Sequence, residues 1–474
     1  MPIAATSEFL DRLFAALPDG TFRAHKEGEL DDPRGRHQGL SATVAMPRTV
    51  SEVSTIVRLC HDADVGVVPL GGGTGLVLGQ VAFEGPAPVV MSLERMTAVR
   101  EIYPSENAMV VEAGAILHDV QAAAEAVDRL FPLSLASEGT CRIGGNLATN
   151  AGGLNVLRYG NTRDLCLGLE VVLADGTIWN GLKRLRKDNT GYDLKNLMIG
   201  SEGSLGIITA ATLRLFPRPR HEATAILVVD HPQGAIDLLA LAQQNLGEGI
   251  SAFEMLSGVG LDFLAETMPD VRQPFDKRPD WCVLIDLGLS GDGDPAEMLL
   301  ALFEAALEAG LVSDGVISQN EAQRQAFWSV RENIPTGNRH IGSISSHDIS
   351  IPLSRIPDFI PEGIAKLQAL GDVRINCFGH LGDGNLHYNV FPAKGRDRAE
   401  FDNIRGAVKK CVHDLTHAYE GSVSAEHGVG RLKVEDLERY QDPVKLAAMR
   451  AIKQALDPKG IMNPGAVLRS SGYV

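Results

Sequence analysis

The sequence predicts an α+β protein with two or more domains. A chain of 474 residues exceeds the usual size of one domain, and 44% hydrophobic with 22% charged residues is ordinary for a globular protein. The pattern changes at Pro217-Arg218-Pro219-Arg220, where a proline pair ends a strand. Before this boundary, helices and strands surround glycine-rich loops. After it, strands are separated by Ala/Leu-rich helices.

The first elements follow from apolar spacing. Residues 1–17 predict an amphipathic helix capped by Ser7, and acidic Glu8 and Asp11 stand where a secretory signal would be basic. Residues 53–63 have helical spacing, and the β-branched run 65–70 predicts a strand that ends in a glycine loop.

Further elements complete the region before the boundary. Residues 109–136 predict a strand, a helix over 117–129 and a proline-marked loop at 131–135. Residues 167–173 and 177–179 predict a β-hairpin with an Asp-Gly turn. Residues 205–216 then alternate as a strand.

Beyond the boundary, strands at 225–229 and 281–287 and helices at 235–244 and 295–309 predict one antiparallel sheet with helices on a face. A last helix is expected over 443–456. We therefore divide the chain into residues 1–219, with a core from about 40, a second domain at 220–424 and a C-terminal segment at 425–474.

Charge and composition exclude several classes of function. The formal net charge of −16 argues against a nucleic-acid-binding protein, which needs a basic face. The six cysteines have no paired spacing, which fits a reduced, cytoplasmic chain. No apolar run approaches the roughly 20 residues that cross a bilayer, so we expect no transmembrane segment. Peripheral docking at the inner membrane face stays open.

Two glycine-rich stretches suit a phosphate-bearing cofactor. Residues 71–80 (GGGTGLVLGQ) follow a strand, and their backbone N–H groups can converge on a phosphate. The loop lacks the Rossmann spacing, and by itself it is more typical of a structural turn. Residues 137–160 (SEGTCRIGGNLATNAGGLNVLRYG) are too rich in small residues to form a core. Together the two stretches indicate a long dinucleotide, with a buried loop as the structural alternative.

Two histidines flank a glycine turn near the C-terminus. His380 and His387 would face opposite sides of one straight strand, so the turn Gly382-Asp383-Gly384 must bend the chain to bring both rings to one ion. Asp383 is then placed to orient one ring. Two imidazoles and the carboxylate of Glu426 form a typical catalytic metal set, with His427 as a spare base. The alternative is surface histidines on a hairpin.

Five segments together resemble the FAD-linked oxidoreductases of the vanillyl-alcohol oxidase type. They are the two glycine stretches, the hairpin LGLEVVLADG, the stretch TGYDLKNLMIGSEGSLG at 190–206 and the terminal Asn463-Pro464-Gly465. Among these oxidoreductases, the D-2-hydroxyglutarate and D-lactate dehydrogenases are most similar. The resemblance runs in order from about residue 47 to 468. It implies a two-part FAD-binding domain of the PCMH type, an antiparallel α+β cap domain and a C-terminal helical segment that returns to the flavin.

The resemblance also implies the cofactor residues. In relatives with covalent flavin a histidine stands where this chain has Thr74, so FAD is expected to be non-covalent here. The implied FAD-binding residues are Leu70, Gly71, Gly72, Gly73, Thr74, Gly75, Gly79, Gln80, Ser137, Gly139, Thr140, Gly144, Gly145, Thr149, Asn150, Gly153, Ile207 and Asn463.

For the reaction, the resemblance implies that His380, His387 and Glu426 bind the metal and that His427 is the catalytic base. Zn²⁺ is expected, with Mn²⁺ or Fe²⁺ as alternatives. A 2-hydroxy acid can chelate such an ion through its carboxylate and hydroxyl, and the ion lowers the hydroxyl pKa. Arg331 and Asn389 match substrate-binding residues of the family, and an arginine suits a carboxylate.

One position departs from the family. The hydroxyglutarate enzymes carry a lysine for the distal carboxylate where this chain has Ser346, so Arg339, His340 or His347 would have to supply that charge.

We expect an FAD- and metal-dependent dehydrogenase that oxidises a small anionic D-2-hydroxy acid, with D-2-hydroxyglutarate favoured. A D-lactate or glycolate enzyme, an oxidase and an inactive flavin-binding protein are the alternatives. A quinone or an electron-transfer flavoprotein is the expected acceptor, and a homodimer is one option for the assembly.

Overall fold

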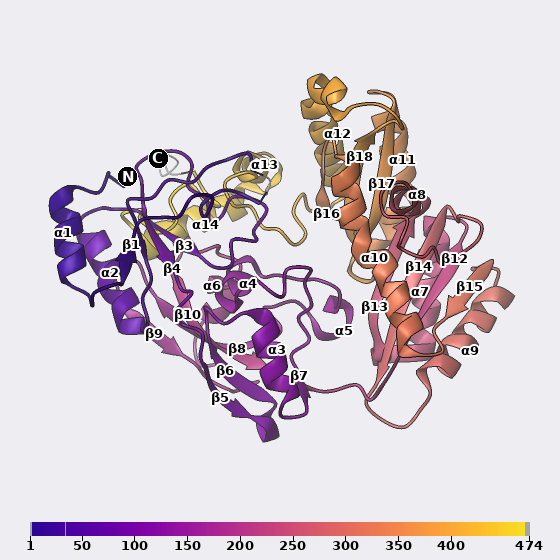
Figure 1. The fold of residues 1–474 in the computed structure, drawn as a ribbon, viewed down its shortest axis with the longest axis horizontal. Coiled ribbons are helices and arrows are strands. Elements are labelled where there is room, and N and C mark those ends of the chain that lie inside the picture. The colour runs from indigo at the N-terminus through magenta and orange to yellow at the C-terminus, as the bar shows by residue number, and fades with distance from the viewer. Residues whose placement is uncertain (1, 34, 470–474) are drawn as a thin grey trace. The chain divides into compact units, whose positions relative to one another are not determined.

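The computed structural model describes residues 2–33 and 35–469 and forms two compact units. The described residues of Met1–Gly152, Gly160–Pro217 and Glu426–Val474 form the first unit, and Gly153–Tyr159 with Arg218–Ala425 form the second (Figure 1). Met1 of the predicted N-terminal helix and residues 470–474 of the predicted C-terminal segment lie outside the described residues.

The first unit contains a four-stranded sheet of order β1-β2-β4-β3, a five-stranded sheet of order β5-β6-β10-β8-β9 and the short pair β11-β7. The smaller sheet has parallel pairs around β4, whereas all pairs in the five-stranded sheet are antiparallel. The strands are β1 (Phe22–Arg23), β2 (Thr43–Ala45), β3 (Val67–Leu70), β4 (Val89–Ser92), β5 (Val99–Tyr103), β6 (Ala108–Glu112), β7 (Arg129–Leu130), β8 (Cys166–Val172), β9 (Ile178–Gly181), β10 (Ile207–Arg214) and β11 (Phe216–Pro217).

The α-helices of this unit are α1 (Ser7–Ala15), α2 (Val50–Asp62), α3 (Leu117–Glu125), α4 (Ile143–Thr149), α6 (Leu194–Met198), α13 (Val434–Tyr440) and α14 (Pro443–Leu456). Two predictions need correction. The cap of α1 is the Thr6 hydroxyl, which accepts from the Phe9 N–H, so Ser7 is already helical. The helix predicted over 117–129 ends at Glu125, because Asp128 adopts a left-handed backbone and the chain re-enters as β7.

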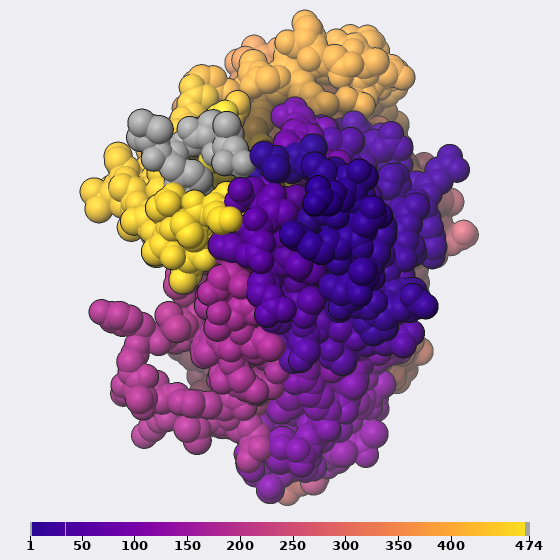
Figure 2. Space-filling model, turned by 90° about the vertical axis from the view of Figure 1, so that its left-hand side faces the viewer, coloured from indigo at the N-terminus to yellow at the C-terminus, as the bar shows by residue number. Residues whose placement is uncertain are grey.

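The C-terminal segment belongs to the first unit, as the resemblance implies. The N–H of Val67 in β3 donates to Ile461 and the N–H of Asn463 donates to Val67, so the chain end runs beside β3. Figure 2 shows the yellow C-terminal part of the chain against the indigo N-terminal part. The segment after β9, residues 183–194, is exposed and projects from this unit (Figure 2).

A buried lysine fixes the end of α14. Lys453 is 5% exposed, and its ammonium donates to the carbonyls of Ser204 and Met462 and to the Asp457 carboxylate. Burial lowers the pKa of Lys453, and the charge of Asp457 opposes that shift. The ammonium therefore ties the C-terminal helix to the loop before β10.

Lys453→Met is expected to lower the free energy of unfolding by about 3–5 kcal/mol, because it leaves the Asp457 carboxylate buried without its cation. Denaturant unfolding of the FAD-loaded protein measures this change. The matched control is Lys410→Met, which breaks the exposed i,i+4 pair with Asp414 and should have little effect. Equal effects of the two substitutions would contradict the role of the buried pair.

The second unit is built on one seven-stranded antiparallel sheet of order β15-β12-β14-β13-β17-β18-β16. Its strands are β12 (His221–Val229), β13 (Ile250–Ser257), β14 (Trp281–Leu289), β15 (Asp314–Ile317), β16 (Asp348–Ser350), β17 (Val373–His380) and β18 (Asn385–Pro392). Its α-helices are α5 (Val156–Tyr159), α7 (Pro232–Leu246), α8 (Gly258–Thr267), α9 (Pro295–Glu308), α10 (Glu321–Ile341), α11 (Ile356–Gln368) and α12 (Arg405–Ala418).

Helices cover both faces of this sheet, which corrects the expectation of one covered face. One apolar core joins the sheet to α7, α9, α11 and α12. A second core, which includes Leu256, Leu284 and Phe378, joins the opposite face to α8 and α10. Because the central strands are buried on both sides, they lack the alternation that marks a half-exposed strand.

The six cysteines are free thiols. No helix in the described part of the chain is both long and apolar enough to span a bilayer.

Candidate active site

The two glycine stretches lie against each other in the first unit. A Cβ on Gly72 would lie 2.2 Å from the Thr140 carbonyl oxygen, and one on Gly71 would lie 3.5 Å from the Cα of Gly145. The approach at Gly72 therefore requires glycine, whereas the distance at Gly71 is an ordinary van der Waals contact. Open space remains beside Gly73, Gly139 and Gly145, where an added Cβ would meet no heavy atom within 4 Å. The paired loops therefore fit a phosphate or a flat ring, as FAD binding requires.

Side chains hold the first loop in shape. The Gln80 amide donates to the carbonyls of Gly73 and Gly75 at 3.3 and 3.0 Å. Arg431 donates to the carbonyls of Leu78 and Gly79, both at 2.8 Å. The loop is thus stabilised from within and from the C-terminal segment.

Asn463 and Glu202 connect the same parts of the unit. The Asn463 amide donates to the carbonyls of Gly79 and Glu202, and its oxygen accepts from Arg431. The Glu202 carboxylate accepts the N–H groups of Val429 and Gly430. Burial raises the pKa of Glu202 to about 7, although both N–H groups oppose the shift. Glu202 thereby anchors the chain just after His427.

The other predicted cofactor residues belong to the two glycine-rich loops and to the strands and helix beside them. Leu70 ends β3, Ile207 begins β10, and Gly144 packs against Ala113. The Ser137 carbonyl accepts from Thr140, the Thr149 hydroxyl donates to Gly145, and Asn150 caps α4 in a left-handed conformation. Thr74, Gly75 and Gly79 lie in the first loop. Gly153 groups with the second unit instead.

Gly72→Ala is expected to weaken FAD binding about ten- to a hundredfold, because the methyl group forces the two loops apart. The FAD content of purified protein and its dissociation constant measure the loss. Gly406→Ala serves as the control, since an added Cβ there meets nothing within 4 Å. Unchanged FAD affinity in the Gly72 variant would refute this account of the loops.

The histidine pair lies on a hairpin, as predicted. His380 ends β17 and His387 lies in β18, joined by a turn in which Gly384 has φ +78°. A Cβ at Gly384 would lie 2.4 Å from the Ile351 carbonyl oxygen, so the turn requires glycine. His387 pairs with Phe378, two residues before His380, and the hairpin therefore puts both imidazoles on one face.

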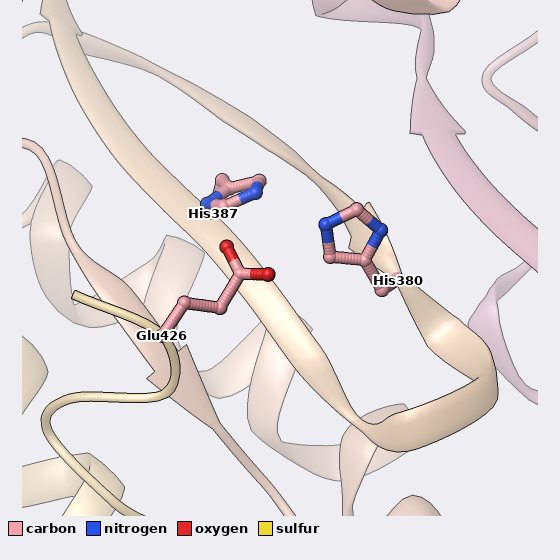
Figure 3. Close-up of side chains that lie close together, drawn as sticks. All are labelled: His380, His387 and Glu426. Atoms are coloured by element: carbon pink, nitrogen blue, oxygen red, sulfur yellow. The ribbon is translucent and has the colours of Figure 1, made fainter. Parts of the chain in front are cut away.

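Glu426 is the third side chain of a group that could hold a metal ion. It directly follows Ala425, whose N–H donates to Asp348 of β16. One ligand atom from each of His380, His387 and Glu426 lies within 4.8 Å of the others, and the three side chains point toward one another (Figure 3). Two imidazoles and a carboxylate at this spacing fit a divalent ion with open coordination positions. His427 is the next residue in the chain.

A residue that the sequence did not reveal orients His380. Glu254 of β13 pairs with His380 across the sheet, and its carboxylate lies 2.6 Å from the His380 Nδ1. Burial would raise the pKa of Glu254, but the charges of His380 and Arg331 outweigh it and hold the pKa at about 2. An ionised carboxylate only accepts, so Nδ1 of His380 donates this hydrogen bond, and Nε2 is the ring nitrogen that would bind a metal in place of a proton.

Arg331 belongs to the same cluster. This side chain of α10 is 5% exposed, and its Nε donates to Glu254 at 2.7 Å. Its guanidinium lies 4.9 Å from the centre of the Phe378 ring, and that ring in turn contacts His387. The predicted substrate arginine and the two predicted metal-binding histidines therefore share one side of the sheet.

The remaining predicted substrate residues lie nearby in the second unit. The Asn389 side-chain oxygen accepts the N–H of His347 at 3.0 Å, and His347 is buried against His413. Ser346 is exposed and bonded to Ser343. Asp383, predicted to orient a histidine, is exposed and accepts from the N–H of Asn385. Arg339 and His340 are exposed at the end of α10.

The chain matches two family models. One, described as FAD binding domain, covers residues 41–181, and the other, described as FAD linked oxidases, C-terminal domain, covers residues 218–467.

Curated relatives match over most of the chain. A mitochondrial D-2-hydroxyglutarate dehydrogenase of Arabidopsis thaliana is 38% identical over 92% of this chain and 76% of its own length. The D-2-hydroxyglutarate dehydrogenase of Stutzerimonas stutzeri is 36% identical over 90% of both chains.

Solved structures show the same fold at low identity. A p-cresol methylhydroxylase aligns with a TM-score of 0.77 over 99% of both chains at 16% identity. An alkyldihydroxyacetonephosphate synthase aligns with a TM-score of 0.72 over 98% of this chain and 85% of its own.

The paired glycine loops, the two family models and the relatives that match over most of the chain agree: the chain belongs to the FAD-linked oxidases and is an FAD-dependent hydroxyacid dehydrogenase.

Proposed function

We propose that this protein is a divalent-metal-dependent D-2-hydroxy acid dehydrogenase with D-2-hydroxyglutarate as the favoured substrate. The observation that carries the proposal is the set of His380, His387 and Glu426, whose ligand atoms approach within 4.8 Å. Arg331 and His380 both contact the Glu254 carboxylate. The guanidinium of Arg331 is a cation suited to bind a carboxylate of the substrate.

In this proposal His380, His387 and Glu426 would hold a Zn²⁺ ion, which would supply a Lewis acid for the carboxylate and hydroxyl of the substrate. His427 takes the hydroxyl proton, and the hydride leaves C2, so that the 2-oxo acid forms. Bound FAD supplies the two-electron acceptor. Arg331 holds a carboxylate through its guanidinium. A quinone or an electron-transfer flavoprotein would reoxidise the flavin.

A shorter acid such as D-lactate is the second candidate, because of Ser346. Its neutral hydroxyl is hydrogen-bonded to the Ser343 hydroxyl. A hydroxyl cannot form an ion pair with the distal carboxylate of the substrate, as an ammonium would. Turnover of D-2-hydroxyglutarate and D-lactate with an artificial acceptor distinguishes the two. We expect a higher kcat/KM for the dicarboxylate, and a preference for lactate would overturn that choice of substrate while the reaction type stands.

Ser346→Lys extends the comparison. If the dicarboxylate lacks a cation at this position, the lysine should lower the KM for D-2-hydroxyglutarate and leave that for D-lactate unchanged. An equal effect on both acids would show that residue 346 does not face the distal carboxylate.

A further inference from the structure

Glu254 has two partners that serve different tasks. The residue is fully buried in the middle of β13. One carboxylate oxygen lies 2.6 Å from Nδ1 of the metal ligand His380, and the other accepts from Nε of Arg331 at 2.7 Å. One carboxylate thus contacts both the proposed metal site and the proposed carboxylate-binding group.

A second buried pair shows what a purely structural carboxylate looks like on this sheet face. Asp286 of β14 accepts from Arg324 of α10, from the Thr224 hydroxyl and from the Trp328 indole. Arg324 and Arg331 lie seven residues apart, two turns along the same helix face. Asp286 has the same type of partner as Glu254, but its hydrogen bonds reach no residue of the metal set.

The bonds of Glu254 fix the direction of each partner. With Nδ1 bonded to the carboxylate, His380 presents Nε2 to a metal, and the anionic acceptor increases its basicity. The hydrogen bond from Nε of Arg331 to Glu254 fixes the orientation of the guanidinium plane. No hydrogen bond joins its two terminal nitrogens to another residue in the described part of the chain. That edge is therefore left for a bidentate contact with a carboxylate.

We propose that Glu254 is a positioning residue that anchors both the metal ligand His380 and the substrate-binding Arg331. The inference rests on the proposed function, because it takes His380 as a ligand and Arg331 as a carboxylate clamp. It adds that metal affinity and substrate affinity depend on one buried carboxylate.

Three variants test this role in the FAD-loaded protein: Glu254→Gln, Arg331→Met and the double substitution. The metal dissociation constant is measured by competition for Zn²⁺ with a chromophoric chelator. Glu254→Gln should weaken Zn²⁺ binding about ten- to a hundredfold, as loss of an outer hydrogen-bond partner does. Arg331→Met should leave Zn²⁺ affinity equal or tighter, since it removes a positive charge near the ion. Glu254→Gln and Arg331→Met should each raise the KM for a 2-hydroxy acid.

The double variant separates positioning from folding. Replacing both members of a buried ion pair costs far less stability than removing one. The double variant should therefore recover thermal stability, yet bind Zn²⁺ as weakly as Glu254→Gln. Asp286→Asn, which breaks the matched pair, should lower stability while Zn²⁺ affinity stays at the wild-type value.

The inference is overturned if Glu254→Gln or the double variant binds Zn²⁺ within about threefold of wild type, or if Asp286→Asn weakens Zn²⁺ binding equally. In those cases wild-type turnover still supports the proposed function. A wild-type protein that binds no Zn²⁺, Mn²⁺ or Fe²⁺ and still oxidises the acid would refute both the metal dependence and the metal-positioning role of Glu254.

Discussion

His427→Ala is expected to slow flavin reduction by a D-2-hydroxy acid about 10²–10⁴-fold, the usual contribution of a general base. The substitution removes the group that takes the hydroxyl proton. It leaves the loop anchored, because Glu202 bonds to Val429 and Gly430 rather than to the imidazole. Anaerobic stopped-flow absorbance of the flavin measures the rate.

The matched control is His118→Ala, an exposed histidine of α3 in the same unit. This variant should reduce its flavin at the wild-type rate. FAD content and Zn²⁺ content should be unchanged in both proteins. A His427 variant that retains the wild-type rate would exclude this residue as the base.

Loss of the metal is the second large effect. His387→Ala, or chelation of the wild-type protein, should lower the rate of flavin reduction by about 10²–10⁴-fold, since a Lewis acid contributes several kcal/mol to the transition state. FAD should stay bound, because the glycine loops belong to the first unit and His387 to the second. Dithionite should still bleach the flavin.

Added Zn²⁺ should restore the chelated wild type but not the His387 variant. His417→Ala, an exposed histidine of α12, is the control and should behave as wild type. Full activity of the metal-free protein would mean that the three side chains serve another purpose.

Local patterns in the sequence were sufficient to predict part of the fold and of the candidate site. The period of a strand requires a bend between His380 and His387, and the hairpin supplies it. Helix α14 has the predicted bounds because Pro443 starts it and the Asp457-Pro458 pair follows it. The paired glycine stretches indicated close backbone approach, which Gly72 and Thr140 make.

Contacts between residues distant in the chain could not be predicted in the same way. Glu254 reaches His380 through the register of β13 and β17, which are 126 residues apart at this point. A single acidic residue in the apolar run ISAFEMLS was the available signal. Helices on both sheet faces were missed because a strand buried on both sides has no alternation to read. The end of α3 depended on one left-handed residue, Asp128.

Ser346 is the position that we propose to set the length of the substrate. It lies four residues before Ser350 of β16, the strand whose Asp348 pairs with His387. The kcat/KM values of the wild-type and Ser346→Lys proteins for D-2-hydroxyglutarate and D-lactate test this role.

The most direct test of the central claim is anaerobic flavin reduction by D- and L-2-hydroxy acids, each with and without a chelator. We predict rapid bleaching by the D-acid, loss of that bleaching with the chelator, recovery with Zn²⁺ and slow or no bleaching by the L-acid. An equal rate of bleaching with and without the chelator, or faster bleaching by the L-acid than by the D-acid, would contradict a metal-dependent D-2-hydroxy acid dehydrogenase.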